Sequence, residues 1–140
     1  MAESLAFKVV TPERTLMEGL PIKSLIVPSV GGYLGVLPDH APMIASLRIG
    51  VVKYRENGEY KKMAVTGGFL EVVGNRAVIL ADAAELAGDI DVLRARAAKE
   101  RAEARLREKR SGIDFHRAQA ALQRAQTRLR IAEDRGEREH

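Results

Sequence analysis

Arginine side chains near the C-terminal end are the residues whose spacing most plainly suggests chemistry. On a helix, an arginine with a carboxylate three or four residues away usually forms a local ion pair. Most arginines in this region have such a carboxylate, but Arg101, Arg124 and Arg128 do not. Arg124 and Arg128 also lie one helical turn apart, where like charges destabilise an isolated helix by roughly 0.2–0.5 kcal/mol. An external anion would remove this repulsion.

Arg94 completes the set, because it lies seven residues before Arg101 and therefore on the same face of a helix. A hairpin of two helices would bring Arg94 and Arg101 close to the arginine pair of the second helix. Guanidinium groups form strong, charge-assisted hydrogen bonds with phosphate oxygens. The pattern favours a polyphosphate ligand, and the alternative is that all four arginines are solvated surface side chains.

Enzyme chemistry is not indicated by any motif in the chain. No glycine-rich loop of the Walker type precedes a Lys-Ser/Thr pair, and no serine has the Gly-x-Ser-x-Gly setting of a nucleophile. The three histidines, His40, His116 and His140, lack the spacing of a metal site, and the absence of cysteine excludes thiol catalysis. We therefore expect no catalytic residue, no metal site and no activity of the chain alone. Nucleotide hydrolysis by the purified chain would contradict this expectation.

The elements that must position the arginines change in kind near Gly88. Before it, short β-branched or alternating runs are separated by turn residues such as Asn57-Gly58, which predicts antiparallel strands in a β-sandwich or barrel. The expected strands are Leu5–Val10, Ser24–Val27, Tyr33–Val36, Val51–Tyr54, Tyr60–Val65, Phe69–Val73 and Arg76–Leu80.

After Gly88 the apolar period becomes about 3.5 residues, and the strong helix formers alanine, arginine and glutamate dominate. Asp89 or Asp91 would cap a first helix, and Ser111-Gly112 would end it before Asp114 caps a second. The expected apolar seams are Ile90, Leu93, Ala97 and Ala104 in the first helix, and Phe115, Ala118, Leu122, Ala125, Leu129 and Ala132 in the second. The fold class is mixed: a β-sandwich docking domain over residues 1–87, followed by an α-helical hairpin with a polar C-terminal end over residues 88–140.

Net charge is also divided near Gly88. Residues 1–88 hold nine basic and nine acidic side chains, so the whole excess of +4 lies in the hairpin. Such a basic segment suits an acidic protein face, a nucleotide, a nucleic acid or a membrane surface. Nucleic-acid binding is disfavoured because aromatic residues are not interleaved with the basic ones. No apolar run approaches the roughly 20 residues that span a bilayer, so we expect a cytoplasmic protein that meets membranes only through partners.

Three motifs in the β region resemble the epsilon subunit of bacterial F-type ATP synthases. They are Thr11-Pro12-Glu13, Gly32-Tyr33-Leu34-Gly35-Val36-Leu37-Pro38-Asp39-His40-Ala41-Pro42 and Gly67-Gly68-Phe69-Leu70-Glu71-Val72. The resemblance continues in order through the alanine-rich hairpin and leaves out only Arg135–His140. It implies a non-catalytic subunit that couples rotation to ATP synthesis on the cytoplasmic face of the bacterial cell membrane. Whether the coupling ion is H⁺ or Na⁺ is determined outside this chain.

In that family the β-sandwich docks at the foot of the central stalk, against the gamma subunit and the ring of c subunits. The hairpin either folds on the sandwich or extends into the alpha/beta catalytic hexamer, where it inhibits ATP hydrolysis. A continuous helix from Asp89 to Asp134 would reach roughly 70 Å. The resemblance implies that the basic residues in contact with the hexamer are Arg107, Lys109, Arg110 and Arg117.

Some members of the family bind ATP in the folded hairpin through the motif Ile/Leu-Asp-x-x-Arg-Ala, which residues 90–95 match completely. By this resemblance the base and ribose are surrounded by Glu85, Ile90, Asp91 and Ala95, and the phosphates are held by Arg94, Arg101, Arg124 and Arg128. ATP would then act as a regulatory ligand that favours the folded, non-inhibitory hairpin. The sequence leaves open whether Mg²⁺ accompanies the nucleotide.

Overall fold

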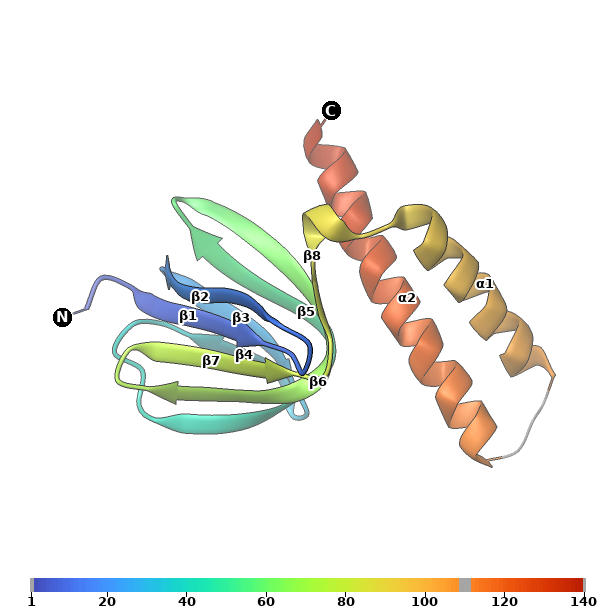
Figure 1. Cartoon of the computed structure of the whole chain (residues 1–140), viewed down its shortest axis with the longest axis horizontal. Helices are drawn as coiled ribbons and strands as arrows, with labels where there is room; N and C mark the ends of the chain where they lie inside the picture. The colour runs from blue at the N-terminus through green and yellow to red at the C-terminus, as the bar shows by residue number, and fades with distance from the viewer. Residues whose placement is uncertain (1, 109–111, 140) are drawn as a thin grey trace.

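The chain folds into a β-sandwich followed by two long helices that lie beside it (Figure 1). The computed structural model describes residues 2–108 and 112–139, without the side chains of residues 113 and 134–139. The mixed fold class predicted from the sequence is thereby confirmed. Eight strands are described: β1 (Leu5–Val10), β2 (Thr15–Ile22), β3 (Ser24–Ser29), β4 (Gly32–Val36), β5 (Met43–Glu56), β6 (Glu59–Val73), β7 (Arg76–Ala81) and β8 (Ala84–Leu86).

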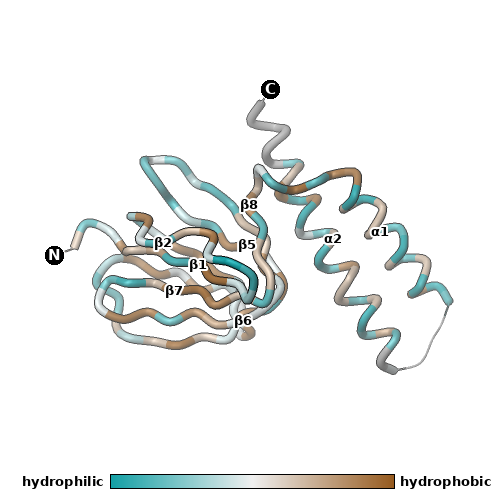
Figure 2. Tube along the Cα trace, viewed as in Figure 1, coloured by the Kyte–Doolittle hydropathy of each residue, from teal (hydrophilic) through white to brown (hydrophobic). Residues whose placement is uncertain are grey.

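In the described part of the chain these strands form one sheet with the order β2-β1-β7-β6-β5-β3-β4, and β8 pairs with β6. The pairing is antiparallel as expected, except that β1 and β7 run parallel. The sheet folds over a single apolar core, in which Phe7, Leu25, Met63 and Ile79 have no exposed surface. Figure 2 shows apolar segments concentrated in these strands.

Two strands were not predicted from the sequence. β2 is an edge strand in which half of the residues are exposed and only Ile22 is buried, so it lacks the alternation of apolar and polar residues that marks a half-buried strand. It also contains Gly19 and Pro21, and proline is tolerated at a sheet edge but is a poor strand signal. β8 spans only Ala84–Leu86, too short for any period to be read.

β6 is one long strand, although the sequence predicted two. The expected break falls at Gly67 and Gly68, which have φ angles of +118° and +122°. An ideal Cβ on Gly68 would lie 2.1 Å from the carbonyl oxygen of Leu80, so only glycine permits this close approach of β6 to β7. The two glycines therefore bend the strand without ending it.

The C-terminal part consists of a 3₁₀ turn, η1 (Ala87–Asp89), and the helices α1 (Val92–Arg107) and α2 (Gly112–Glu139). Of the two expected caps for α1, Asp91 is the one used, because its carboxylate accepts a hydrogen bond from the backbone N–H of Arg94 at 3.0 Å. Gly112 begins α2 with a φ of +49°, so Asp114 lies inside the first turn and does not precede it. Ser111, the other half of the expected stop, lies outside the described residues.

Alanines form the contact between the two helices. Ala95 and Ala102 are buried on α1, and Ala118 and Ala125 are buried on α2. The seam predicted for α2 is largely found, but the one predicted for α1 is wrong at Leu93, whose side chain is 76% exposed. α1 turns its small residues inward because alanines allow two helix backbones to approach closely.

α2 is the inner helix of the hairpin: it packs against β5 and β6, and α1 packs against α2 (Figure 1). The contact with the sandwich is a small apolar cluster of buried residues, Ala64, Ile90, Ile131 and Ala132, with Val51, Ala87 and Val92 at its margin. We call this set the docking cluster. It holds the residues of η1, α1 and α2 against the sandwich.

Candidate anion-binding site of the hairpin

A cavity of about 370 Å³ opens where β8, η1 and both helices meet. It is lined by Glu85, Asp89, Asp91, Arg94, Ala95, Ala98, Arg101 and Arg128. Its volume falls within the range of roughly 300–1,000 Å³ that is usual for small-molecule sites. The continuous stretch from Glu85 to Arg101 and the distant Arg128 therefore share one cavity.

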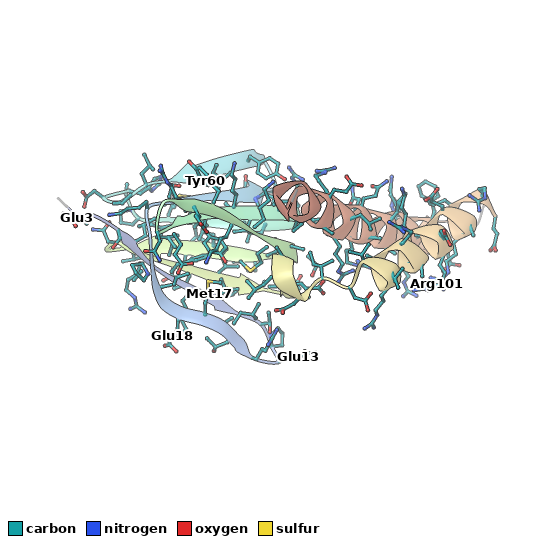
Figure 3. All side chains as sticks on the ribbon, turned by 90° about the horizontal axis from the view of Figure 1, so that it is seen from above. Glu3, Glu13, Met17, Glu18, Tyr60 and Arg101 are labelled. Carbon is teal, nitrogen blue, oxygen red and sulfur yellow. The ribbon has the colours of Figure 1, made fainter. Side chains whose placement is uncertain are left out.

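One face of α1 supplies most of this lining. Positions 91, 94, 95, 98 and 101 recur at intervals of three and four residues, so they lie along one side of the helix. Asp91 fixes the start of that face, since it caps α1 through the Arg94 N–H. The small side chains at Ala95 and Ala98 leave the space that the cavity occupies. Figure 3 places Arg101 on α1, at the opposite end of the molecule from Glu3.

The opposite wall of the cavity is an ion pair between α2 and β8. Arg128 Nε lies 3.5 Å from Glu85 Oε1, and the two side chains are 30% and 31% exposed. The pair links the inner helix to the last strand of the sandwich. Because both partners reach solvent, the pair contributes at most about 1 kcal/mol to stability. Arg128 is thus held at the cavity by a contact weak enough for a bound anion to replace it.

Arg124 lies one turn before Arg128 and lines a second, smaller cavity of about 40 Å³. This cavity also includes Glu85, Thr127 and Arg128, so the two cavities share the ion pair as their common wall. Thr127 is one of the few buried polar residues, and its hydroxyl donates to the carbonyl oxygen of Gln123 at 2.8 Å. The structure therefore brings all four predicted arginines to two adjoining cavities.

Ile90 is the one predicted ligand-binding residue that lines neither cavity. It is 5% exposed and packs in the docking cluster. Asp89 and Ala98 do line the larger cavity, although no sequence signal singled them out as ligand-binding residues. Ala98 follows Asp91 and Arg94 on the same helical face, so the α1 periodicity could have identified it.

The charges around the larger cavity are balanced. Three carboxylates, Glu85, Asp89 and Asp91, are matched by the guanidinium groups of Arg94, Arg101 and Arg128. Such a lining can hold phosphate oxygens on one side and hydrogen-bond donors on the other. Among the residues described, no group of histidine and carboxylate side chains is arranged to hold a metal ion.

Comparison with protein families covers almost the whole chain. Residues 4–87 match the beta-sandwich domain of the ATP synthase delta/epsilon chain, and residues 89–133 match the long alpha-helix domain of the same family. The chain belongs to the ATP synthase delta/epsilon chain family. As a delta/epsilon chain it is a structural and regulatory part of ATP synthase and not a catalytic subunit.

Bacterial epsilon chains are similar to this delta/epsilon chain at high identity. The ATP synthase epsilon chain of Symbiobacterium thermophilum is 56% identical over 107 residues, which cover 76% of this chain and 77% of that protein. The ATP synthase epsilon chain of Moorella thermoacetica is 50% identical over 111 residues, 78% of this chain and 81% of that protein.

Solved structures share the fold of this delta/epsilon chain. A chain in the mitochondrial ATP synthase of Euglena gracilis, solved as an assembly of OSCP, F1 and c-ring, superposes with a TM-score of 0.81 at 19% identity, over 94% of this chain and 82% of that one. A chain of the central stalk and c-ring of the Tetrahymena thermophila enzyme gives a TM-score of 0.58 at 14% identity, over 94% of this chain and 99% of that one. The sandwich and hairpin therefore recur together in distant proteins.

Two of the basic residues expected to contact the hexamer, Arg107 and Arg117, line neither cavity. Arg107 is the last residue of α1 and Arg117 lies in the second turn of α2, and both are exposed. Lys109 and Arg110 lie outside the described residues. Within the residues described, neither helix of this delta/epsilon chain has an apolar stretch that would cross a membrane.

Proposed function

We propose that the chain is the epsilon subunit of the ATP synthase central stalk, and that its hairpin inhibits ATP hydrolysis when it extends. We further propose that ATP binds the folded hairpin and favours the non-inhibitory state. The observation that carries the proposal is the larger cavity, which unites Asp91, Arg94 and Arg101 of α1 with Arg128 of α2. These groups come together only while the hairpin is folded.

The lining suits a nucleoside triphosphate in size and in chemistry. Arg94, Arg101 and Arg128 offer charge-assisted hydrogen bonds to phosphate oxygens, and Arg124 adjoins them through the smaller cavity. Glu85 and Asp91 provide acceptors for the amino group of a base or the hydroxyls of a ribose. The carboxylates do not form a metal site among the described residues, so the proposal does not depend on Mg²⁺.

Ligand binding then sets the state of the hairpin by mass action. A ligand that binds only the folded form stabilises it by RT ln(1 + [L]/Kd), about 2.7 kcal/mol at a hundredfold excess over Kd. When ATP falls, the folded form loses this added stabilisation, and the extended form gains population. High ATP would therefore relieve inhibition, and low ATP would prevent wasteful hydrolysis.

An exposed apolar face of the sandwich supports the proposed docking in the stalk. Phe69 on β6 and Leu80 on β7 are direct cross-strand partners and are 54% and 52% exposed, and Ile44 on neighbouring β5 is 73% exposed. Contiguous apolar side chains on a surface mark protein interfaces. We assign this face to the gamma subunit.

The sheet edge formed by β4 carries further exposed apolar residues. Val30, Tyr33 and Leu37 are 71%, 54% and 63% exposed and lie around the short hairpin of β3 and β4 and the segment after it. We assign this edge to the ring of c subunits, which would place the chain at the cytoplasmic face of the bacterial cell membrane. Its association with the membrane then arises from the complex.

Inhibition would come from basic side chains of the extended hairpin. We assign this role to Arg107 and Arg117, which are exposed in the folded form, together with Lys109 and Arg110. Their partners would be acidic residues of the alpha/beta hexamer. Because surface charges are screened beyond about 10 Å at 0.1 M salt, this contact requires close approach.

The test is an isothermal titration of ATP into the purified chain and into the Arg124→Ala/Arg128→Ala variant. We expect saturable 1:1 binding to the native chain and none to the variant at the same concentrations. Circular dichroism of the variant checks that both helices are retained. Absence of heat with the native chain at millimolar ATP would refute nucleotide control and leave a hairpin governed by its protein partners.

A further inference from the structure

The docking cluster contains one large side chain from α2, and that side chain is completely enclosed. Ile131 is 1% exposed and packs with Ala64 of β6, with Ile90 and with Ala132. The sandwich contributes only small or half-buried residues at this contact, Ala64 and Val51. Ile131 therefore supplies most of the apolar volume that α2 places against the sandwich.

Ile131 shares its helical face with the arginines of the site. It follows Arg128 by three residues and Arg124 by seven, so the burial of Ile131 fixes the rotation of α2 that brings both arginines into the lining of the smaller cavity with Glu85. The position of α2 along β6 also determines whether Arg128 can reach Glu85 Oε1.

Ile90 connects the same cluster to the other half of the site. It directly precedes Asp91, the residue that caps α1 and lines the larger cavity. Ile90 is buried and lines neither cavity, so its position does not favour direct contact with a ligand. Its burial against Ile131 instead holds the start of α1 beside the middle of α2.

We propose that Ile90 and Ile131 are positioning residues, whose mutual burial couples the docking of α2 on the sandwich to the assembly of the ligand site. This inference rests on the proposed function for the identity of the ligand, but the coupling itself is a property of the chain without ligand. Opening of α2 would then release Asp91 and α1, and disturbance of Ile90 would release α2. The site and the docked state form as one unit.

Hydrogen–deuterium exchange of the full chain without nucleotide measures this coupling. Ile131→Ala leaves a cavity in the docked state while alanine favours the helix itself, so the opening equilibrium should rise at least thirtyfold, roughly what the loss of a buried isoleucine side chain implies. Ile131→Val removes only one methyl group, so the opening equilibrium should rise by about threefold to tenfold. The matched control is Leu93→Ala, which removes an apolar side chain that is already 76% exposed on α1.

The location of the change decides between coupling and local packing. We expect Ile131→Ala to speed exchange at residues 87–95 as well as at 124–132. Ile90→Ala should likewise speed exchange at residues 124–132 as well as at 87–95. The double variant should show less than the product of the two single effects, because the same contact is lost once. Acceleration confined to α2, or equal to that of Leu93→Ala, would overturn the proposal.

A second series adds ATP and separates this inference from the proposed function. If ATP binds, it should slow exchange in both segments of the native chain, and saturating ATP should restore protection in Ile131→Val with a higher apparent Kd. A matching rise in Kd for Leu93→Ala would overturn the coupling. If ATP changes nothing even in the native chain, nucleotide binding is refuted, and the ligand-free exchange pattern still decides the coupling.

Discussion

Two arginines of α1 that differ in facing provide a sharp test of the site. Both residues are exposed, but Arg94 lines the larger cavity and Arg96 lines neither cavity. They are two residues apart and therefore point about 200° apart around the helix. Replacement of each by alanine removes the same charge from the same helical turn, so the two variants differ only in the direction of the lost side chain.

The expected magnitude follows from the contact that Arg94 can make. A hydrogen bond between charged groups contributes about 1.5–3 kcal/mol, which corresponds to roughly tenfold to 150-fold in Kd. Arg94→Ala should weaken ATP binding by that factor. Neither variant should unfold the chain, because alanine is the best helix former and the Asp91 cap uses the backbone N–H of Arg94 and not its side chain. Arg96→Ala should change Kd by less than about twofold.

Isothermal titration at fixed ionic strength is the assay, with helix content checked for both variants by circular dichroism. If Arg94→Ala binds ATP like the native chain, or if Arg96→Ala loses as much affinity, the cavity is not the site and the facing argument fails. Equal losses would point to a diffuse electrostatic attraction by the basic hairpin.

Three further predictions concern the cap, the glycine bend and alkaline stability. Asp91→Ala should destabilise the hairpin by about 1 kcal/mol in urea unfolding, whereas Asp91→Asn should retain the cap and lose little. Gly68→Ala should lower the free energy of unfolding by at least about 3 kcal/mol or prevent folding, because the added Cβ would meet the Leu80 carbonyl. The control is Gly88→Ala, whose Cβ would meet no atom within 4 Å, and which should be tolerated in the same expression and melting assay. Burial raises the pKa of the Tyr54 hydroxyl, so its stabilising contribution is complete below its ordinary pKa of about 10 and is lost as pH rises through the higher folded pKa. Tyr54→Phe should therefore flatten the alkaline decline of melting temperature, and an unchanged slope would refute this assignment.

Local patterns predicted those elements whose periodicity matches their burial. β1 was predicted with its observed bounds, because its buried and half-buried residues alternate along the whole strand. β2 and β8 were missed since an exposed edge and a three-residue strand carry no such alternation. Gly67 and Gly68 were interpreted as a break because sequence alone does not reveal that a neighbouring strand approaches closely enough to require them.

The same reasoning located the arginines but not the roles of their neighbours. Arg101, Arg124 and Arg128 stood out because no carboxylate of their own helix could pair with them, and the structure places them at two adjoining cavities. The ion pair between Arg128 and Glu85 joins segments 43 residues apart, so no local spacing could predict it. The burial of Ile90 depends in the same way on Ile131, which lies far along the chain.

The alanine contact between α1 and α2 repeats at intervals of seven residues. Ala95 and Ala102 are one interval apart on α1, and Ala118 and Ala125 are one interval apart on α2. Ala132 follows at the same interval but packs in the docking cluster. A shift of one helix along the other by seven residues, about 10.5 Å, would again bring small residues together. The alanine seam therefore sets the distance between the helices but leaves their register degenerate. The register is specified by the single bulky residue at the end of the repeat, Ile131, which packs at one position on the sandwich, the docking cluster.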